Sequence, residues 1–233
     1  KRQLVGFLMF VLITIAGRQG ALTIVTVIFN VVVFAIGFWK AGDTSNVLEM
    51  CSRLVILFAV ITLVGLNGIH KKTWAALFTT LIVLVMIMGI FDVVIHHAED
   101  LDYSTMEYLG SIENPDEIFH AEILISGLGA IMDVAVAIAA SLSEIVEKKP
   151  KVTFLELFKS GREIGYDIMG TMINVLLFVF SCGLIPMCLI RMNNDVSLIT
   201  IIKLHIPCEL CRFLVESIGI CLLYTSDAAD DLI

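Results

Sequence analysis

The sequence predicts an all-α protein, a polytopic bundle of transmembrane helices. Of its 233 residues, 58% are apolar and 16% are charged, whereas soluble domains have about 45–50% and about 25%. The excess of apolar residues lies in uncharged runs close to the roughly 20 residues that an α-helix needs to cross a bilayer. This composition excludes a soluble enzyme and leaves little chain for a separate soluble domain.

Seven helical segments are predicted from these runs, the first and the last of them truncated. They are residues 4–16, 21–39, 51–69, 74–95, 117–140, 164–190 and 206–220. Residues 221–233 turn abruptly from an apolar helix into an acidic tail that resembles translated sequencing-adapter sequence. Residues 1–3 resemble the end of the translation that the same adapter gives at a 5′ boundary. We therefore expect the natural bundle to comprise residues 4–220.

Local signals mark where two of the helices begin. Residues 114–117, Asn-Pro-Asp-Glu, have the order of an N-cap, a first-turn proline and an acidic first turn. Thr153 and Glu156 have the spacing of a capping box. They predict a short basic amphipathic helix over residues 154–160 that lies on the membrane surface and ends at Gly161.

The basic residues predict the orientation in the cell membrane. Lysine and arginine collect in cytoplasmic loops, and here they collect in the loops at 70–73 and 144–163, with none between Lys72 and Lys148. The loop at 96–116 is acidic instead. We expect the two basic loops to be cytoplasmic and the acidic loop to be external.

Two stripes of small and polar residues are the main candidates for a functional site. In segment 117–140, Asp133 shares one helix face with Ser126, Gly129, Ala130, Ala137 and Ala140. In segment 164–190, a second stripe follows the same helical spacing and consists of Asp167, Gly170, Thr171 and Asn174. A carboxylate at the centre of a bilayer costs at least about 2.5–3.5 kcal/mol on insertion scales, so it is normally turned inward, paired or protonated.

Two interpretations of the stripes stay open. In one, they face each other and line a proton- or cation-linked pathway, with Asp133 and Asp167 as carriers. In the other, Asp133, Asp167 and Asn174 only form interhelical hydrogen bonds between closely packed helices. The break predicted at residues 181–186, which contain Gly183 and Pro186, favours transport, although no matching break occurs elsewhere.

Weaker patterns occur near the helix ends. Asp92 and His96 have the i,i+4 spacing of metal ligands beside His97, Glu99 and Asp100, but a solvated acidic vestibule explains them better. Cys208 and Cys211 form a single CxxC without a second pair. Glu216 has the spacing to pair with Arg212, or it reflects a sequence error near the adapter junction. We expect no metal, no cofactor and no nucleic-acid partner.

Three motifs resemble the YibE/F-like family of bacterial multi-pass membrane proteins. They are GLGAIMDVA at residues 127–135, FKSGREIGYDIMGTMIN at 158–174 and SCGLIP at 181–186. The resemblance extends over about residues 4–220 and implies a bundle of about eight helices, preceded in complete members by a signal-like helix and an external domain. It implies no particular activity.

The leading functional hypothesis is a permease-like membrane protein, not an enzyme, that moves a small solute or ion with its intramembrane aspartates. The alternative is a non-transporting assembly or regulatory protein whose aspartates are structural. In either case the lipid bilayer is a partner, and a homo-oligomer remains open.

Overall fold

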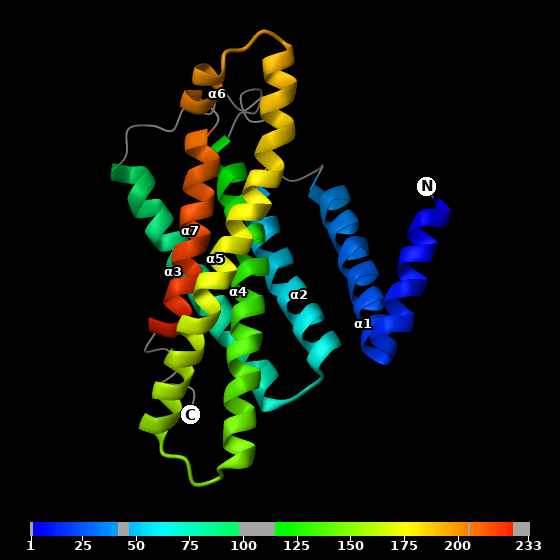
Figure 1. Ribbon diagram of the computed structural model, residues 1–233, viewed down its shortest axis with the longest axis vertical. Helices are drawn as coiled ribbons and strands as arrows, with labels where there is room; N and C mark the ends of the chain where they lie inside the picture. Colours follow the sequence, from blue (N-terminus) through cyan, green and yellow to red (C-terminus); the bar gives the residue numbers. More distant parts are fainter. Residues whose placement is uncertain (1, 42–46, 98–114, 205, 226–233) are drawn as a thin grey trace.

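The computed structural model describes residues 2–41, 47–97, 115–204 and 206–225, which form seven helices and no strand (Figure 1). In chain order the helices are α1 (Arg2–Ala41), α2 (Val47–Asn67), α3 (Lys71–His97), α4 (Pro115–Lys148), α5 (Phe154–Asn193), α6 (Leu198–Leu204) and α7 (Ile206–Thr225). The predicted all-α helix bundle is confirmed.

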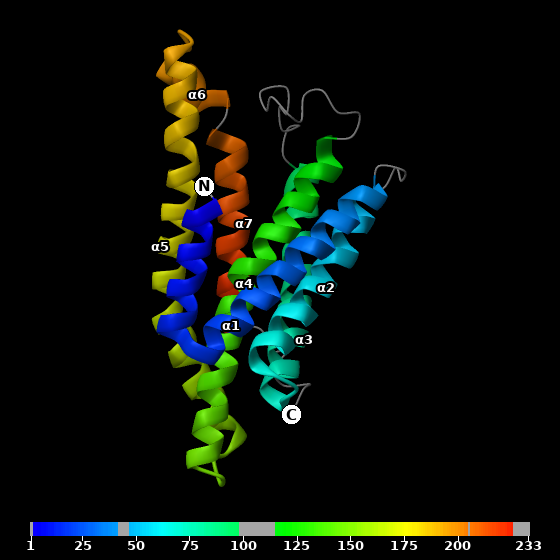
Figure 2. The same ribbon diagram turned by 90° about the vertical axis from the view of Figure 1, so that its right-hand side faces the viewer.

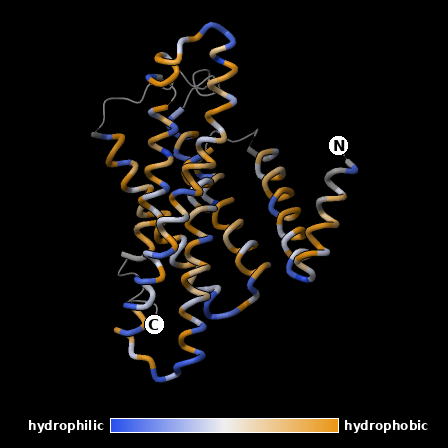
Figure 3. The backbone as a smooth tube through the Cα atoms, in the orientation of Figure 1, coloured by the Kyte–Doolittle hydropathy of each residue, from blue (hydrophilic) through white to orange (hydrophobic). Residues whose placement is uncertain are grey.

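Five of the described helices, α1 to α5, are long and apolar enough to cross a membrane. Figure 3 shows hydrophobic residues along these helices and hydrophilic ones at the turns that join α2 to α3 and α4 to α5. Helix α7 has 20 residues, but it carries Glu209, Arg212 and Glu216, so composition alone does not mark it as a span. Each predicted segment lies largely within a helix, with the first two segments sharing α1. Helix α6 was not predicted.

Helix α1 consists of two arms joined by a sharp bend at Gly17. The backbone there has φ 55° and ψ −129°, a conformation that glycine adopts far more readily than residues with a Cβ atom. Figure 1 shows the two arms folding back at this point, beside α2. The bend falls between the predicted segments 4–16 and 21–39, which are therefore the two arms.

The second arm of α1 packs against α2 through small and polar residues. A Cβ atom at Gly65 of α2 would lie 2.9 Å from Oγ1 of Thr26, so the two backbones approach closely here. Nearby, Nδ2 of Asn30 donates a hydrogen bond of 2.9 Å to Oγ1 of Thr62. Small residues and interhelical hydrogen bonds are the usual means of helix association in membranes.

Helix α4 is the centre of the bundle and contacts α2, α3, α5 and α7. Figure 2 shows α5 and α7 on one side of α4 and α2 on the other. Its buried side chains include Ile123, Ile131 and Val134, which join Ile87 and Phe91 of α3 in the apolar core. Asn114 lies outside the described residues, but Pro115 begins α4 and an acidic first turn follows, as predicted.

The predicted end of a surface helix at Gly161 is wrong. The capping box forms as expected, with Thr153 and Glu156 each bonding the other's backbone N–H. Helix α5 then continues through Gly161, because this glycine lies inside the helix and is buried against Leu142 of α4. The basic amphipathic residues are thus the first turns of one long helix.

The predicted break at residues 181–186 is also wrong. Helix α5 continues through Pro186 and ends at Asn193. Proline removes one backbone donor, and transmembrane helices tolerate this loss where neighbouring groups satisfy the freed carbonyl.

Candidate functional site

The α4 stripe predicted from the sequence is divided: Ser126 contacts α7, whereas Gly129 and Asp133 lie on the outside of the single chain. Gly129 and Asp133 are exposed, and a Cβ atom at Gly129 would meet nothing within 4 Å. The close helix contact expected along this face is therefore missing at Gly129 within the described part of the chain.

The α5 stripe is exposed as well. Asp167, Gly170, Thr171 and Asn174 all point away from the bundle. Thr171 donates to the carbonyl of Ile168, and Asn174 donates to the carbonyl of Gly170, both over 2.7 Å. These polar groups are satisfied by their own helix.

The two stripes do not face each other, so that part of the sequence interpretation is wrong for the single chain. Helix α5 instead turns its other side to the bundle. Gly161 and Gly165 are buried there, and Ile168, Met169 and Met172 pack against the apolar core. The packing of these residues rotates the polar stripe outward.

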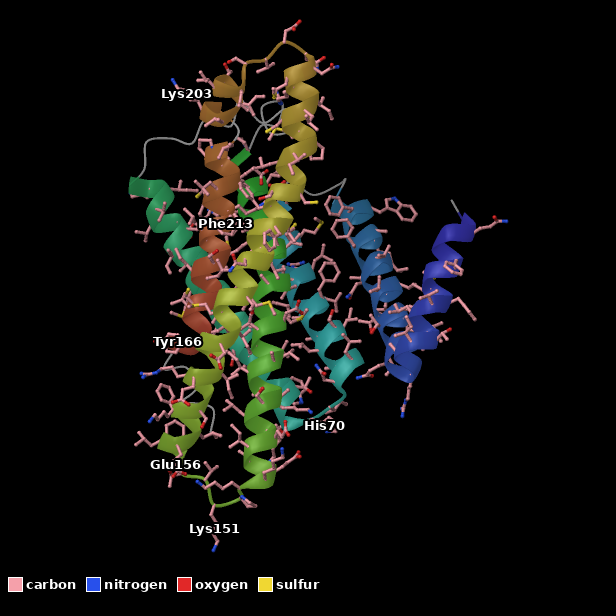
Figure 4. The ribbon with its side chains drawn as sticks, in the orientation of Figure 1. His70, Lys151, Glu156, Tyr166, Lys203 and Phe213 are labelled. Carbon is pink, nitrogen blue, oxygen red and sulfur yellow. The ribbon has the colours of Figure 1, made fainter. Side chains whose placement is uncertain are left out.

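The structure has a cavity between α4, α5 and α7, lined by both polar and apolar residues and including Ser126 of the predicted α4 stripe. Its volume is about 300 Å³. Its lining comprises one residue of α4, four of α5 and four of α7: Ser126, Leu176, Val179, Phe180, Gly183, Glu209, Arg212, Phe213 and Glu216. In Figure 4, the labelled Phe213 lies between Lys203 at one end of the bundle and Tyr166 towards the other. Phe213 also stacks on Phe180, with ring centroids 5.9 Å apart.

Glu216 is the buried carboxylate of this cavity. It is only 7% exposed and lies near the middle of α7, ten residues or about 15 Å beyond Ile206 at 1.5 Å per residue. Ser126 of α4 donates a hydrogen bond from its Oγ to Oε1 of Glu216. The same hydroxyl lies 2.8 Å from the carbonyl of Glu122.

Arg212 joins two further carboxylates beside the cavity. Its Nη2 atom lies 2.5 Å from Oε2 of Glu209, and its Nη1 atom lies 3.8 Å from Oε2 of Glu122. That Glu122 oxygen is buried and has no hydrogen-bond partner among the described residues. Among the described residues, the ion pairs of Arg212 are with Glu209 and Glu122, and Glu216 receives its hydrogen bond from Ser126 instead.

The family model of YibE/F-like proteins matches residues 4–226, almost the whole chain. The chain belongs to the YibE/F-like protein family. No curated protein and no solved structure matches it. With five long apolar helices, this YibE/F-like protein is a membrane protein.

Sequence reasoning missed the cavity in this YibE/F-like protein, although a signal was present. Glu209, Arg212 and Glu216 fall at offsets 0, +3 and +7, which places them on one face of α7. Glu122 and Ser126 have i,i+4 spacing on α4. The sequence interpretation leaves Glu216 open between a pair with Arg212 and a sequence error, and it does not combine this residue with Glu209, Glu122 and Ser126 into one pattern on two helices.

A second polar contact of the YibE/F-like chain joins α3 to α4. Nε2 of His120 lies 2.8 Å from Oδ1 of Asp92, and Nδ1 of His120 lies 2.7 Å from the carbonyl of Asp116. The described residues hold no group of three or more potential metal ligands. Glu99, Asp100 and the side chain of His97 lie outside the described part of the chain.

The cysteines of the CxxC pair differ in their surroundings. Cys208 is buried and Cys211 is partly exposed, and neither forms a disulfide within the described part of the chain. Cys208 is one of the residues in the apolar core. This placement favours the reading of Cys208 as a small hydrophobic residue.

Proposed function

We propose that this YibE/F-like protein is a permease-like transporter that moves a small solute or ion across the cell membrane. The observation that carries the proposal is the cavity of about 300 Å³ between α4, α5 and α7, with the buried carboxylate of Glu216 in its wall. This cavity replaces the Asp133 and Asp167 stripes as the place where transport is expected.

The energetics of burial support the proposal. An ionisable side chain within the membrane is costly and marks a substrate or ion pathway by default. The volume is at the lower end of the roughly 300–1,000 Å³ that small-molecule pockets occupy. A small solute or a hydrated ion fits this space.

The positions of the basic turns support the proposed orientation. In Figure 4, His70 and Lys151 lie at the same end of the bundle, opposite to Lys203. The basic loops at 70–73 and 144–163 would therefore share the cytoplasmic side, with the acidic loop at 96–116 external. Lys203 lies on the other side and does not follow this bias.

A second candidate function is the non-transporting assembly protein. The observation in its favour is the exposure of Asp133 on an apolar helix, because a carboxylate facing lipid is costly and a partner helix would cover it. In this case the aspartates would stabilise the contact with a partner protein, and the polar residues around the cavity would have a structural role.

Two matched glycine variants separate these functions. A Cβ atom meets nothing within 4 Å at either Gly183 or Gly170 of α5, so a side chain can begin in open space at both positions. Gly183 lines the cavity, and Gly170 lies on the exposed stripe. Gly183→Trp fills the cavity, whereas Gly170→Trp leaves it open.

The experiment measures proton and ²²Na⁺ flux into liposomes that contain purified protein. We expect protein-dependent flux of at least one ion, reduced at least tenfold by Gly183→Trp and little changed by Gly170→Trp. A stronger loss of flux in Gly170→Trp than in Gly183→Trp would indicate that the α5 stripe, and not the cavity, is the transport site. Absence of flux of either ion in the unmodified protein would contradict ion-linked transport and favour the assembly protein.

A further inference from the structure

Among the described residues, Glu216 forms no ion pair, although Arg212 is one turn of α7 away. Arg212, the one cation in the cavity wall, lies 2.5 Å from Glu209 and 3.8 Å from Glu122. Glu216 receives the hydroxyl of Ser126 instead. The two carboxylates beside Arg212 therefore already share its positive charge.

The charges around the cavity do not balance. With every group ionised, three carboxylates face one guanidinium. A buried carboxylate that has one neutral hydrogen-bond donor, and whose nearby cation is already paired with two other carboxylates, is disfavoured in a medium of low dielectric constant. Neutralising Glu216 removes this penalty, so the site favours a positive charge and repels anions.

The Ser126 hydroxyl suits both ways of neutralising Glu216. A hydroxyl is one donor and two acceptor lone pairs. It donates to the ionised carboxylate, and by rotating it accepts from the O–H of a protonated one, so the contact between the two residues survives proton binding. Carboxylate and hydroxyl oxygens are also hard ligands of the kind that hard metal cations prefer.

We propose that Glu216 and Ser126 form the binding site for one univalent cation, a proton or Na⁺. The role of this cation rests on the proposed function: if the protein is a transporter, binding of the cation drives transport. A proton enters from water and forms an O–H bond with a carboxylate oxygen of Glu216, and Na⁺ binds without any covalent change. Glu209, Glu122 and Arg212 form a separate ion-paired group at the cavity edge.

The test uses the purified protein in detergent, so that binding is measured without transport. Infrared difference spectra between high and low pH report the C=O stretch of a carboxyl group that takes up a proton. We expect this band in the unmodified protein, its loss in Glu216→Gln, and its retention in Asp133→Asn. The two substitutions make the same chemical change inside and outside the cavity.

Sodium chloride and choline chloride distinguish the two cations. If Na⁺ binds, sodium shifts the midpoint of the Glu216 band to lower pH and choline does not. If the proton alone binds, the midpoint is the same in both salts. Either result supports the site, and a band that persists in Glu216→Gln overturns it.

A second pair of variants keeps the test decisive if Glu216→Gln fails to fold. Ser126→Ala removes the hydrogen bond to Glu216 and is expected to shift the frequency of the band. Ser217→Ala is the control, because Ser217 is a neighbouring buried serine that donates to its own helix at Phe213. A band unmoved by Ser126→Ala would also overturn the site. Cation binding without flux in liposomes would refute the transporter and leave the site intact, whereas flux without this band would refute the site alone.

Discussion

His120 and Asp92 join α4 to α3 through a contact of 2.8 Å between Nε2 and Oδ1. The imidazole ring of His120 also packs edge-on against Phe91, with ring centroids 4.8 Å apart. One side chain therefore combines an apolar contact and a polar contact with the neighbouring helix. The side chain of His120 is 14% exposed, whereas that of Asp92 is 65% exposed.

We expect Asp92→Ala to lower the free energy of unfolding by about 0.5–1.5 kcal/mol, the net contribution of a typical hydrogen bond. His120→Ala costs more, because it also removes the contact with Phe91. A double-mutant cycle in detergent isolates the coupling between Asp92 and His120 from these other losses. Strictly additive effects of the two substitutions would show that the contact does not contribute to stability.

Gly219 of α7 is expected to tolerate alanine poorly. A Cβ atom there would lie 2.8 Å from Cδ1 of Ile131 and 3.1 Å from Cγ2 of Ile87, both in the core. Gly129→Ala is the matched control, because it gives the same helix-propensity gain in open space. In detergent, we expect the free energy of unfolding of Gly219→Ala to be about 1–3 kcal/mol lower than that of Gly129→Ala. Equal effects would mean that α7 and α4 are further apart.

The capping box at the start of α5 gives a local prediction. Thr153→Ala removes the acceptor for the backbone N–H of Glu156, and loss of such a cap costs about 1 kcal/mol. Hydrogen exchange at residues 154–157 should become faster, whereas Thr153→Ser should retain the protection. Thr171→Ala is a control in mid-helix and should leave exchange in the first turn unchanged. Unaltered exchange in Thr153→Ala would show that the cap is unimportant.

The bend at Gly17 determines how the two arms of α1 fold back. Alanine at this φ and ψ is strained by about 1–3 kcal/mol, so Gly17→Ala should open or broaden the angle between the arms. Spin labels at the exposed positions Phe10 and Val25 would report a longer or wider distance distribution by electron paramagnetic resonance. Gly6→Ala, in the regular part of α1, should leave this distribution unchanged. A distribution insensitive to Gly17→Ala would place the bend elsewhere.

The helices were predictable because their signals are local. Apolar runs gave the approximate position of each long helix, and the Thr153 and Glu156 pair gave the start of α5. The predicted ends at Gly161 and at residues 181–186 failed because glycine and proline interrupt isolated helices more readily than packed ones. At Gly161 the contact with Leu142 of α4 favours the helix, and no local pattern contains that contact.

The sequence by itself determined an all-α membrane bundle, the turn between the arms of α1, and a small set of polar residues inside apolar helices. Only the tertiary structure decided which of those residues meet. Ser126 and Glu216 are 90 residues apart, while Asp133 and Asp167 lie on exposed faces. The physical reason is that lipid is as apolar as the interior of the bundle. Hydrophobic periodicity therefore cannot tell the packed face of a membrane helix from its lipid-facing side, and only helix packing determines which polar residues are buried.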